Sequence, residues 1–249
     1  MSTIEYQRNN KYQKVYQIFG KKKIFLPVVH VVTMDQVKKN IEILSRLDIQ
    51  GCWIINHSCS DDIFSMAYNF IKTDYPKLWV GINYLSGNPL DPINFCLKYS
   101  IYPNGFWFDN IGVLDDNIKV AEYITKIIKS NNFDNVLIFG SICFKYQIQP
   151  KNVSLTTQNA MNFVDIITTS GKGTGQEHEV ADINKFNLMK SICDGHNYLA
   201  VASGISESNI LNIIESVDIF MVNSSIALNE IFIEEKLLKL KNIINLFNN

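Results

Sequence analysis

Residues 24–44, IFLPVVHVVTMDQVKKNIEIL, decide the fold, because a continuous apolar run is followed at once by a helical pattern. The run at 24–31 is rich in β-branched residues, which is typical of a strand buried on both faces. Over 35–47, Val37, Ile41 and Leu44 recur at three- and four-residue steps, and Asp35 is a suitable N-cap. The stretch therefore predicts one strand–helix unit.

The same unit repeats along the rest of the chain. We expect strands at 24–31, 51–56, 78–85, 105–109, 135–142, 164–170, 198–203 and 218–223. Helical stretches follow them at 35–47, 61–73, from 92, 116–129, 156–162, 182–193, from 206, and 230–247. Alternating strands and helices indicate α/β architecture with a parallel sheet.

Eight units predict a single-domain (β/α)8 TIM barrel over residues 24–249, preceded by a polar N-terminal extension at 1–23. A doubly wound open sheet is the alternative. That fold usually carries a glycine-rich turn after its first strand, whereas residues 32–34 are Val, Thr and Met.

Composition excludes several classes of function. The 249 residues carry 23 Lys plus Arg against 24 Asp plus Glu, so no net positive charge favours nucleic acid or an anionic membrane. No apolar run reaches the roughly 18 residues of a membrane span. The five cysteines show no metal or redox spacing, which indicates reduced thiols in the cytoplasm. We expect no cofactor.

Candidate site residues follow from the strand ends, because TIM barrels carry their active sites at the C-terminal ends of the strands. His30, Asp109 and Lys145 lie at or just after three such ends. A carboxylate, an imidazole and an amine close together shift one another's pKa values, as acid–base catalysis requires. We predict these three as the catalytic groups, with Asn83 orienting the substrate.

A phosphate site is predicted at the same mouth of the barrel. The segment Thr168 to Gln176, TTSGKGTGQ, offers backbone N–H groups on glycines beside a lysine. The loops after strands seven and eight, the usual phosphate site of this fold, add hydroxyl and amide groups. The predicted phosphate-binding residues are Lys172, Gly173, Ser203, Gly204, Asn223 and Ser224. A helix opening at Ser206 would point its N-terminus at the same mouth.

Other chemistry-bearing residues have simpler interpretations. His57 with Cys59, and the run Glu177-His178-Glu179, carry metal-ligand types, but further ligands are not evident and adjacent residues rarely converge on one ion. We therefore predict no metal. The tryptophans at positions 53, 79 and 107 fall inside strands and are predicted to fill the barrel, with an outward orientation of Trp107 as the alternative.

Five segments also match a known family in order and spacing. They are Val28-Val29-His30, Gly81-Ile82-Asn83-Tyr84-Leu85 with Asn88, Phe144-Lys145, Asp165 to Gly175, and Ser203-Gly204-Ile205 with Asn209. In these the chain resembles the BtpA/SgcQ family of predicted TIM-barrel proteins. The resemblance implies a barrel with a phosphate-type site. The chain departs from the family at residues 31–34, which replace a Pro/Gly-rich loop. It also has Asn56-His57 where the family has Glu-Asn, and Tyr146 where it has histidine.

The sequence thus favours an enzyme acting on a phosphorylated sugar or nucleotide-like metabolite, with the reaction open among isomerase, transferase and lyase chemistry. The alternative is a non-catalytic BtpA-like assembly or regulatory factor. A metal-dependent hydrolase using His30, His57 and Asp109 is a third and more remote hypothesis. The apolar closing helix at 230–247 is a surface for either a second copy of the chain or the barrel alone.

Overall fold

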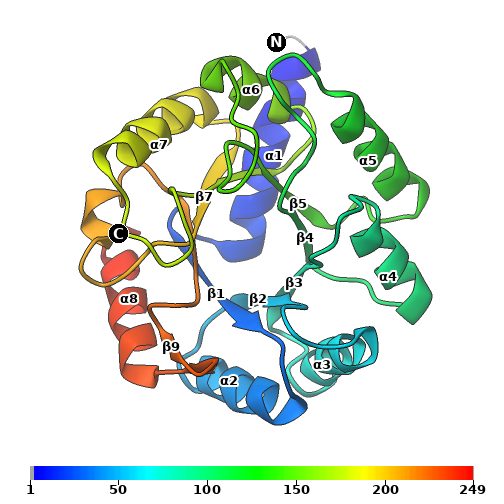
Figure 1. Cartoon of the computed structure of the whole chain (residues 1–249), viewed down its shortest axis with the longest axis vertical. Coiled ribbons are helices and arrows are strands. Elements are labelled where there is room, and N and C mark those ends of the chain that lie inside the picture. Colours follow the sequence, from blue (N-terminus) through cyan, green and yellow to red (C-terminus); the bar gives the residue numbers. More distant parts are fainter. Residues whose placement is uncertain (1–2, 249) are drawn as a thin grey trace.

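The computed structural model describes the backbone of residues 3–248 and the side chains of residues 11–248, and it forms a closed parallel barrel ringed by helices (Figure 1). The strands are β1 (Ile24–His30), β2 (Gly51–Ile55), β3 (Trp79–Asn83), β4 (Gly105–Phe108), β5 (Leu137–Ser141), β6 (Ile166–Thr169), β7 (Tyr198–Ala202) and β8 (Ile219–Val222). Each strand pairs in parallel with the next, and β8 pairs with β1. The predicted (β/α)8 barrel is confirmed.

Helices follow the strands around the ring. They are α2 (Met34–Arg46), α3 (Asp61–Asp74), α4 (Asp91–Tyr99), α5 (Lys119–Ser130), α6 (Val153–Ala160), α7 (Val180–Cys193) and α8 (Glu234–Leu246). The first of them begins one residue before the range expected from the pattern, and Thr33 caps it by accepting a hydrogen bond from the backbone N–H of Gln36.

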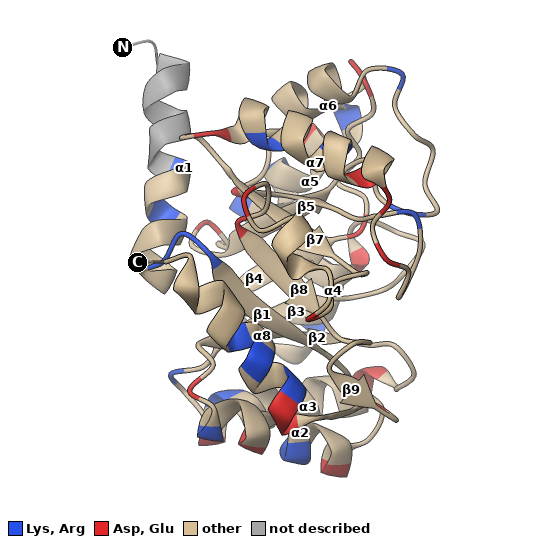
Figure 2. Ribbon diagram, turned by 90° about the vertical axis from the view of Figure 1, so that its left-hand side faces the viewer, with Lys and Arg blue, Asp and Glu red and all other residues tan. Residues whose placement is uncertain are grey.

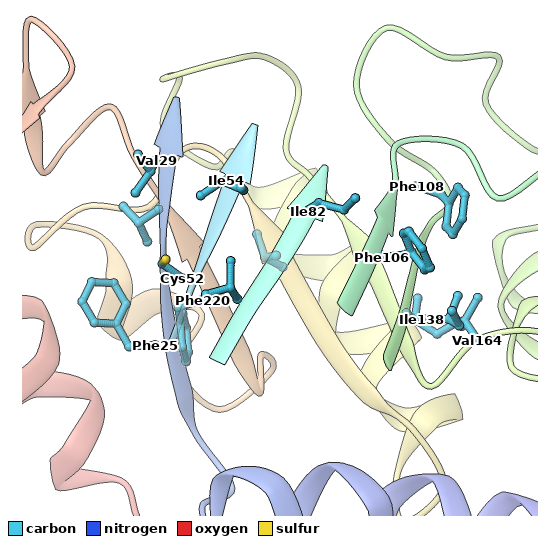
Figure 3. Close-up of a cluster of buried hydrophobic side chains, with 14 of the residues drawn as sticks. Phe25, Val29, Cys52, Ile54, Ile82, Phe106, Phe108, Ile138, Val164 and Phe220 are labelled. Atoms are coloured by element: carbon cyan, nitrogen blue, oxygen red, sulfur yellow. The ribbon is translucent and has the colours of Figure 1, made fainter. Parts of the chain in front are cut away.

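Alternate residues of each strand face opposite sides of the barrel wall. Val29, Ile54 and Ile82 belong to the layer between the strands and the helices (Figure 3). Val28, Trp53 and neighbouring inward side chains form a separate cluster inside the barrel. Because both sides are buried, the strands are apolar throughout, as the sequence predicted.

The Lys, Arg, Asp and Glu residues of the described chain lie in helices and loops, and the strands contain none of them (Figure 2). Among the residues that the structure describes, no helix combines the length and the apolar character needed to cross a lipid bilayer.

Tryptophan rings and glycines interlock inside the barrel. Trp53 lies opposite Gly81 in the β2–β3 register, and Gly51 lies opposite Trp79. A Cβ atom on Gly81 would lie 2.2 Å from the Trp53 ring, far inside van der Waals contact. The glycines therefore leave room for the indoles, and a larger residue at position 81 would displace a ring.

Trp107 completes this cluster from β4. Its ring centroid lies 5.7 Å from that of Trp53, and its Nε1 donates a hydrogen bond of 3.0 Å to Ser141 Oγ. All three tryptophans thus fill the barrel as predicted, and the outward orientation considered for Trp107 is wrong.

Helix α1 (Thr3–Phe19) belongs to the segment expected to be a polar extension. Val15 and Phe19 are buried, and the Phe19 ring lies 5.4 Å from Trp79 at the first residue of β3. Tyr12 stacks on Tyr198 at the start of β7, with ring centroids 4.6 Å apart. The helix therefore covers the N-terminal ends of the strands, opposite the predicted site.

The prediction of a helix from Ser206 is wrong. After β7 the chain makes turns and a short 3-10 helix, η1 (Ile210–Asn212). Asn209 explains this, because its Oδ1 accepts from the N–H of Ser206 at 2.9 Å and its Nδ2 donates to the carbonyl of Gly204 at 2.7 Å. Such side-chain bonds to the local backbone compete with helix formation.

Two other helices start later than the sequence pattern predicted. The helix expected from 116 begins at Lys119, because Asp115 has positive φ and a bridge joins Leu114 to Asn117. The closing helix expected from 230 begins at Glu234. Residues before it form a hairpin of β9 (Ala227–Leu228) and β10 (Ile231–Phe232).

The interlocked interior yields a stability prediction. Gly81→Ala should lower the free energy of unfolding by about 1–3 kcal/mol, because overpacking a core forces side chains out of their preferred rotamers. Each kcal/mol corresponds to about 2–4 °C in Tm for a chain of this length. Gly87→Ala is the matched control, since a Cβ there has no atom within 4 Å. Equal thermal unfolding of the two variants would contradict the interlock.

Candidate active site at the C-terminal face of the barrel

A cavity of about 230 Å³ opens at the C-terminal ends of the strands. Seven residues predicted from the sequence line it: His30, Asn83, Asp109, Lys145, Ser203, Asn223 and Ser224. Val28, Trp107 and Met221 form part of its apolar floor. The strand-end argument thus brings the four predicted catalytic residues to one cavity.

Asp109 is held by Asn83. The Nδ2 of Asn83 donates hydrogen bonds of 2.9 Å to Asp109 Oδ1 and of 2.9 Å to the carbonyl of Trp107. Burial raises the pKa of Asp109, while the hydrogen bond from Asn83 and the charge of Lys145 act in the opposite direction. Asp109 is therefore a carboxyl group suited to holding or releasing a proton nearer neutral pH than usual.

Lys145 follows β5 on the adjoining side of the cavity. Its Nζ donates a hydrogen bond of 2.8 Å to Thr174 Oγ1, and its backbone N–H donates one of 2.8 Å to Ser170 Oγ. Burial lowers the pKa of the Lys145 amine, and the negative charge of Asp109 partly opposes this. The two perturbed groups lie in one cavity with their pKa values displaced toward each other.

His30, at the end of β1, contacts a carboxylate that the sequence analysis missed. Its Nδ1 lies 3.0 Å from Glu230 Oε2, at ion-pair distance but outside hydrogen-bond angles, and neither atom has a hydrogen-bond partner among the described residues. The His30 ring also stacks almost parallel on His57, with centroids 4.7 Å apart. Burial lowers the pKa of His30, and the charge of Glu230 opposes that effect.

The β9–β10 hairpin delivers Glu230 to this position. Asn229 and Glu230 both have positive φ, the backbone of a tight hairpin turn. The Glu230 carbonyl accepts hydrogen bonds from Gln36 Nε2 at 2.9 Å and from Asn40 Nδ2 at 2.8 Å, both on α2. The sequence analysis did not single out Glu230, because it assigned residues 230–247 to one helix.

The predicted phosphate residues divide into two groups. Residues 171–176 form a glycine loop after β6. Ser203 has φ of 79° and joins this glycine loop, because its Oγ donates to the carbonyl of Gly173 at 3.1 Å and accepts from the N–H of Gly175 at 3.2 Å. Asn223 Nδ2 donates a hydrogen bond of 2.8 Å to the carbonyl of Val28, and this bond fixes the Asn223 side chain at the cavity wall.

Lys172, Gly173 and Gly204 lie outside the lining of this cavity. The exposed Lys172 Nζ lies 3.3 Å from Oε1 of Glu179, the N-cap residue of α7. Gly204 is packed tightly, since a Cβ there would lie 2.3 Å from the carbonyl oxygen of Gln176. These residues therefore shape the glycine loop beside the cavity.

His178 anchors the same loop. Its Nε2 lies 3.0 Å from the carbonyl oxygen of Ser203, and burial lowers the pKa of its ring. The histidine of the run Glu177-His178-Glu179 is partly buried. Within residues 11–248, no group of three or more His, Cys, Asp or Glu side chains is arranged to hold a metal ion.

Comparison with known proteins gives similarity in structure alone. No protein-family model and no curated protein matches the chain in sequence. Among solved structures, KGPDC from Streptococcus mutans superimposes with a TM-score of 0.64 at 12% identity, covering 90% of this chain and 98% of that chain. Thiamine phosphate pyrophosphorylase from Pyrococcus furiosus superimposes with a TM-score of 0.61 at 11% identity, covering 92% of this chain and 98% of that chain. N-(5'-phosphoribosyl)anthranilate isomerase from Pyrococcus furiosus superimposes with a TM-score of 0.58 at 8% identity, covering 89% of this chain and 98% of that chain.

These similarities establish the TIM-barrel fold over nearly the whole chain. At such low sequence identity they transfer no residue roles.

The contact between His30 and Glu230 yields a prediction that needs no substrate. Glu230→Gln should lower the pKa of His30 further, because it removes the nearby negative charge that favours the imidazolium. The chain has four histidines, so ring signals are readily assigned by NMR from single His→Gln variants. Glu215→Gln, on the opposite face near Lys23 Nζ, is the control. An unchanged His30 titration in Glu230→Gln would show that the two side chains do not interact in solution.

Proposed function

We propose that this protein is a cytoplasmic enzyme that binds a small phosphorylated sugar or nucleotide-like metabolite at the C-terminal face of its barrel. One observation carries the proposal: a single cavity brings proton-transfer groups together with neutral hydrogen-bond donors. His30, Asp109 and Lys145 come from β1, β4 and β5, whereas Ser203 and Asn223 come from the ends of β7 and β8.

The β7–β8 side suits a phosphate group. TIM barrels commonly bind phosphate with the loops after strands seven and eight. Ser203, Asn223 and Ser224 present hydroxyl and amide groups there, and Lys145 supplies a positive charge to the same cavity. The cavity of about 230 Å³ is small beside the ~300–1,000 Å³ of most ligand sites, which favours a compact phosphorylated group in this part of the site.

The residues contributed by β1, β4 and β5 suit proton transfer. With its Nδ1 facing Glu230, His30 keeps Nε2 for the ligand, and burial favours the neutral ring that a general base requires. Asp109, whose pKa burial raises, is the partner acid, and Asn83 orients it. Lys145 neutralises negative charge developing on the substrate between them. These roles suit isomerisation, group transfer or lyase chemistry.

Two independent similarities support a phosphorylated ligand. Two of the structural neighbours carry a phosphate compound in their names, thiamine phosphate pyrophosphorylase and N-(5'-phosphoribosyl)anthranilate isomerase. The five sequence segments that resemble the BtpA/SgcQ family imply the same kind of site, and we propose a distant relationship to that family.

One observation favours the alternative of a non-catalytic assembly or regulatory factor. Asn56 stands where the family has an acid, and its side chain serves the backbone of the β3–α4 loop. Its Oδ1 accepts from the N–H of Leu85 at 2.6 Å, and its Nδ2 donates to the Leu85 carbonyl at 3.4 Å.

Ligand binding tests the proposal first. In a thermal-shift panel of inorganic phosphate, sugar phosphates and nucleotides, at least one phosphorylated compound should raise Tm. A ligand at 100 times its Kd adds about 2.7 kcal/mol, or about 5–10 °C for a chain of this length. Ser203→Asp should abolish the shift by charge repulsion, whereas Ser154→Asp, outside the cavity on α6, should preserve it. A flat panel would favour the assembly factor.

Asp109→Asn tests the chemistry. With the ligand identified by the panel, the variant should bind normally but lose about 10²–10⁴-fold in kcat, the usual contribution of a general acid or base. Turnover near that of the parent protein would remove Asp109 from the mechanism.

The same variant should also change stability with pH. Because the folded state raises the pKa of Asp109, the folded protein binds more protons than the unfolded chain between the ordinary and the raised pKa, and stability is lost as pH rises through that window. Asp109→Asn should therefore be more stable than the parent at pH 7, with the difference shrinking toward pH 4. Asp134→Asn, at an exposed position before β5, is the control in denaturant unfolding.

A further inference from the structure

A second cavity adjoins the first at the C-terminal ends of β3 and β4. Its volume is about 460 Å³, larger than the first, and three residues belong to the lining of both: Leu85, Trp107 and Asp109. Asp109 therefore stands on the wall between two spaces, only one of which the phosphorylated group would occupy.

The lining of the second cavity has a distinct chemistry. Leu85 and Val120 are exposed apolar side chains, at 39% and 42%, and Pro89 adds further apolar surface. The polar side chains, which include Asn88 and Asn110, are neutral. Asp109 is the one charged side chain among the lining residues, and no Lys, Arg or His is among them.

This composition selects against anions. A phosphate or carboxylate would find no positive charge there and would face the Asp109 carboxyl. An uncharged ring can cover the apolar surface while its edge bonds to the asparagine amides. The two cavities therefore complement the two halves of one molecule, an anionic group on a sugar and a neutral ring.

Asp109 is held from both cavities. Asn83 holds Oδ1, and Gln147 Nε2, which belongs to the second cavity, donates to the backbone carbonyl of Asp109. Among the described residues, no hydrogen bond reaches Oδ2. The carboxyl group is thus fixed at one oxygen and free at the other.

We propose that the second cavity is a subsite for an uncharged heterocyclic ring attached to the phosphorylated sugar, with Asp109 beside the bond that joins the two parts. The subsite rests on the proposed phosphate site, and it narrows the substrate class from sugar phosphates in general to sugar phosphates that carry a neutral ring.

Matched ligands test the subsite by isothermal titration. Ribose 5-phosphate and uridine 5'-monophosphate share the phosphorylated ribose, and the second adds a neutral ring. Uridine 5'-monophosphate should bind at least 10-fold more tightly. Orotidine 5'-monophosphate, which adds a carboxylate to that ring, should lose the advantage.

Gly87→Trp tests where the ring lies. Gly87 lines the second cavity, has no atom within 4 Å of an added Cβ and needs no positive φ, so a side chain can be introduced there without backbone strain. The variant should bind ribose 5-phosphate unchanged and lose the 10-fold preference for uridine 5'-monophosphate. Ser130→Trp, on the exposed end of α5, should keep the preference.

The outcomes separate the two proposals. Equal affinity for ribose 5-phosphate and uridine 5'-monophosphate, or a preference that survives Gly87→Trp, would overturn the ring subsite and leave the phosphate site standing. Failure of all three ligands to bind the parent protein would overturn both proposals.

Discussion

The packing of indole rings against glycines inside the barrel is the constraint on which the rest of the structure depends. Trp53 and Trp79 each cover a glycine on a neighbouring strand, so the register of β2 against β3 is fixed by shape as well as by hydrogen bonds. A one-residue slip would turn every inward side chain outward. Because the register is fixed, the strand ends, and the polar residues on them, have fixed places around the mouth.

The site lies where the inward residues of the strands change from apolar to polar, at the mouth of the barrel. The interior is apolar and without charges up to the level of Trp107, and the next residues toward the mouth are Asn83, Asp109 and His30. Each is partly removed from water by the apolar floor, and burial raises the pKa of Asp109 and lowers the pKa values of Lys145 and His30. Packing and reactivity therefore have one cause in this molecule.

Sequence periodicity predicted the barrel and seven cavity residues because both depend on local pattern: apolar runs make strands, and strand ends share one face. It failed where side chains override local pattern. Asn209 replaces a helix with turns, and the positive φ of Asn229 and Glu230 turns an expected helical start into a hairpin. Glu230 was missed because its importance lies in a contact 200 residues away in the chain, with His30. Lys172 was overestimated as a cavity residue because charge and glycine content do not reveal which way a loop side chain points.

The β9–β10 hairpin also has a consequence for biosynthesis. The barrel closes only when β8 reaches β1, and Glu230 follows β8 in the chain. During translation the N-terminal half, with His30, Asn83 and Asp109 already made, has neither the closed wall nor the carboxylate that faces the histidine. A nascent or prematurely ended chain is therefore chemically incomplete even where its first strands are folded. The order of synthesis thus delays completion of the site until residue 230 has been made.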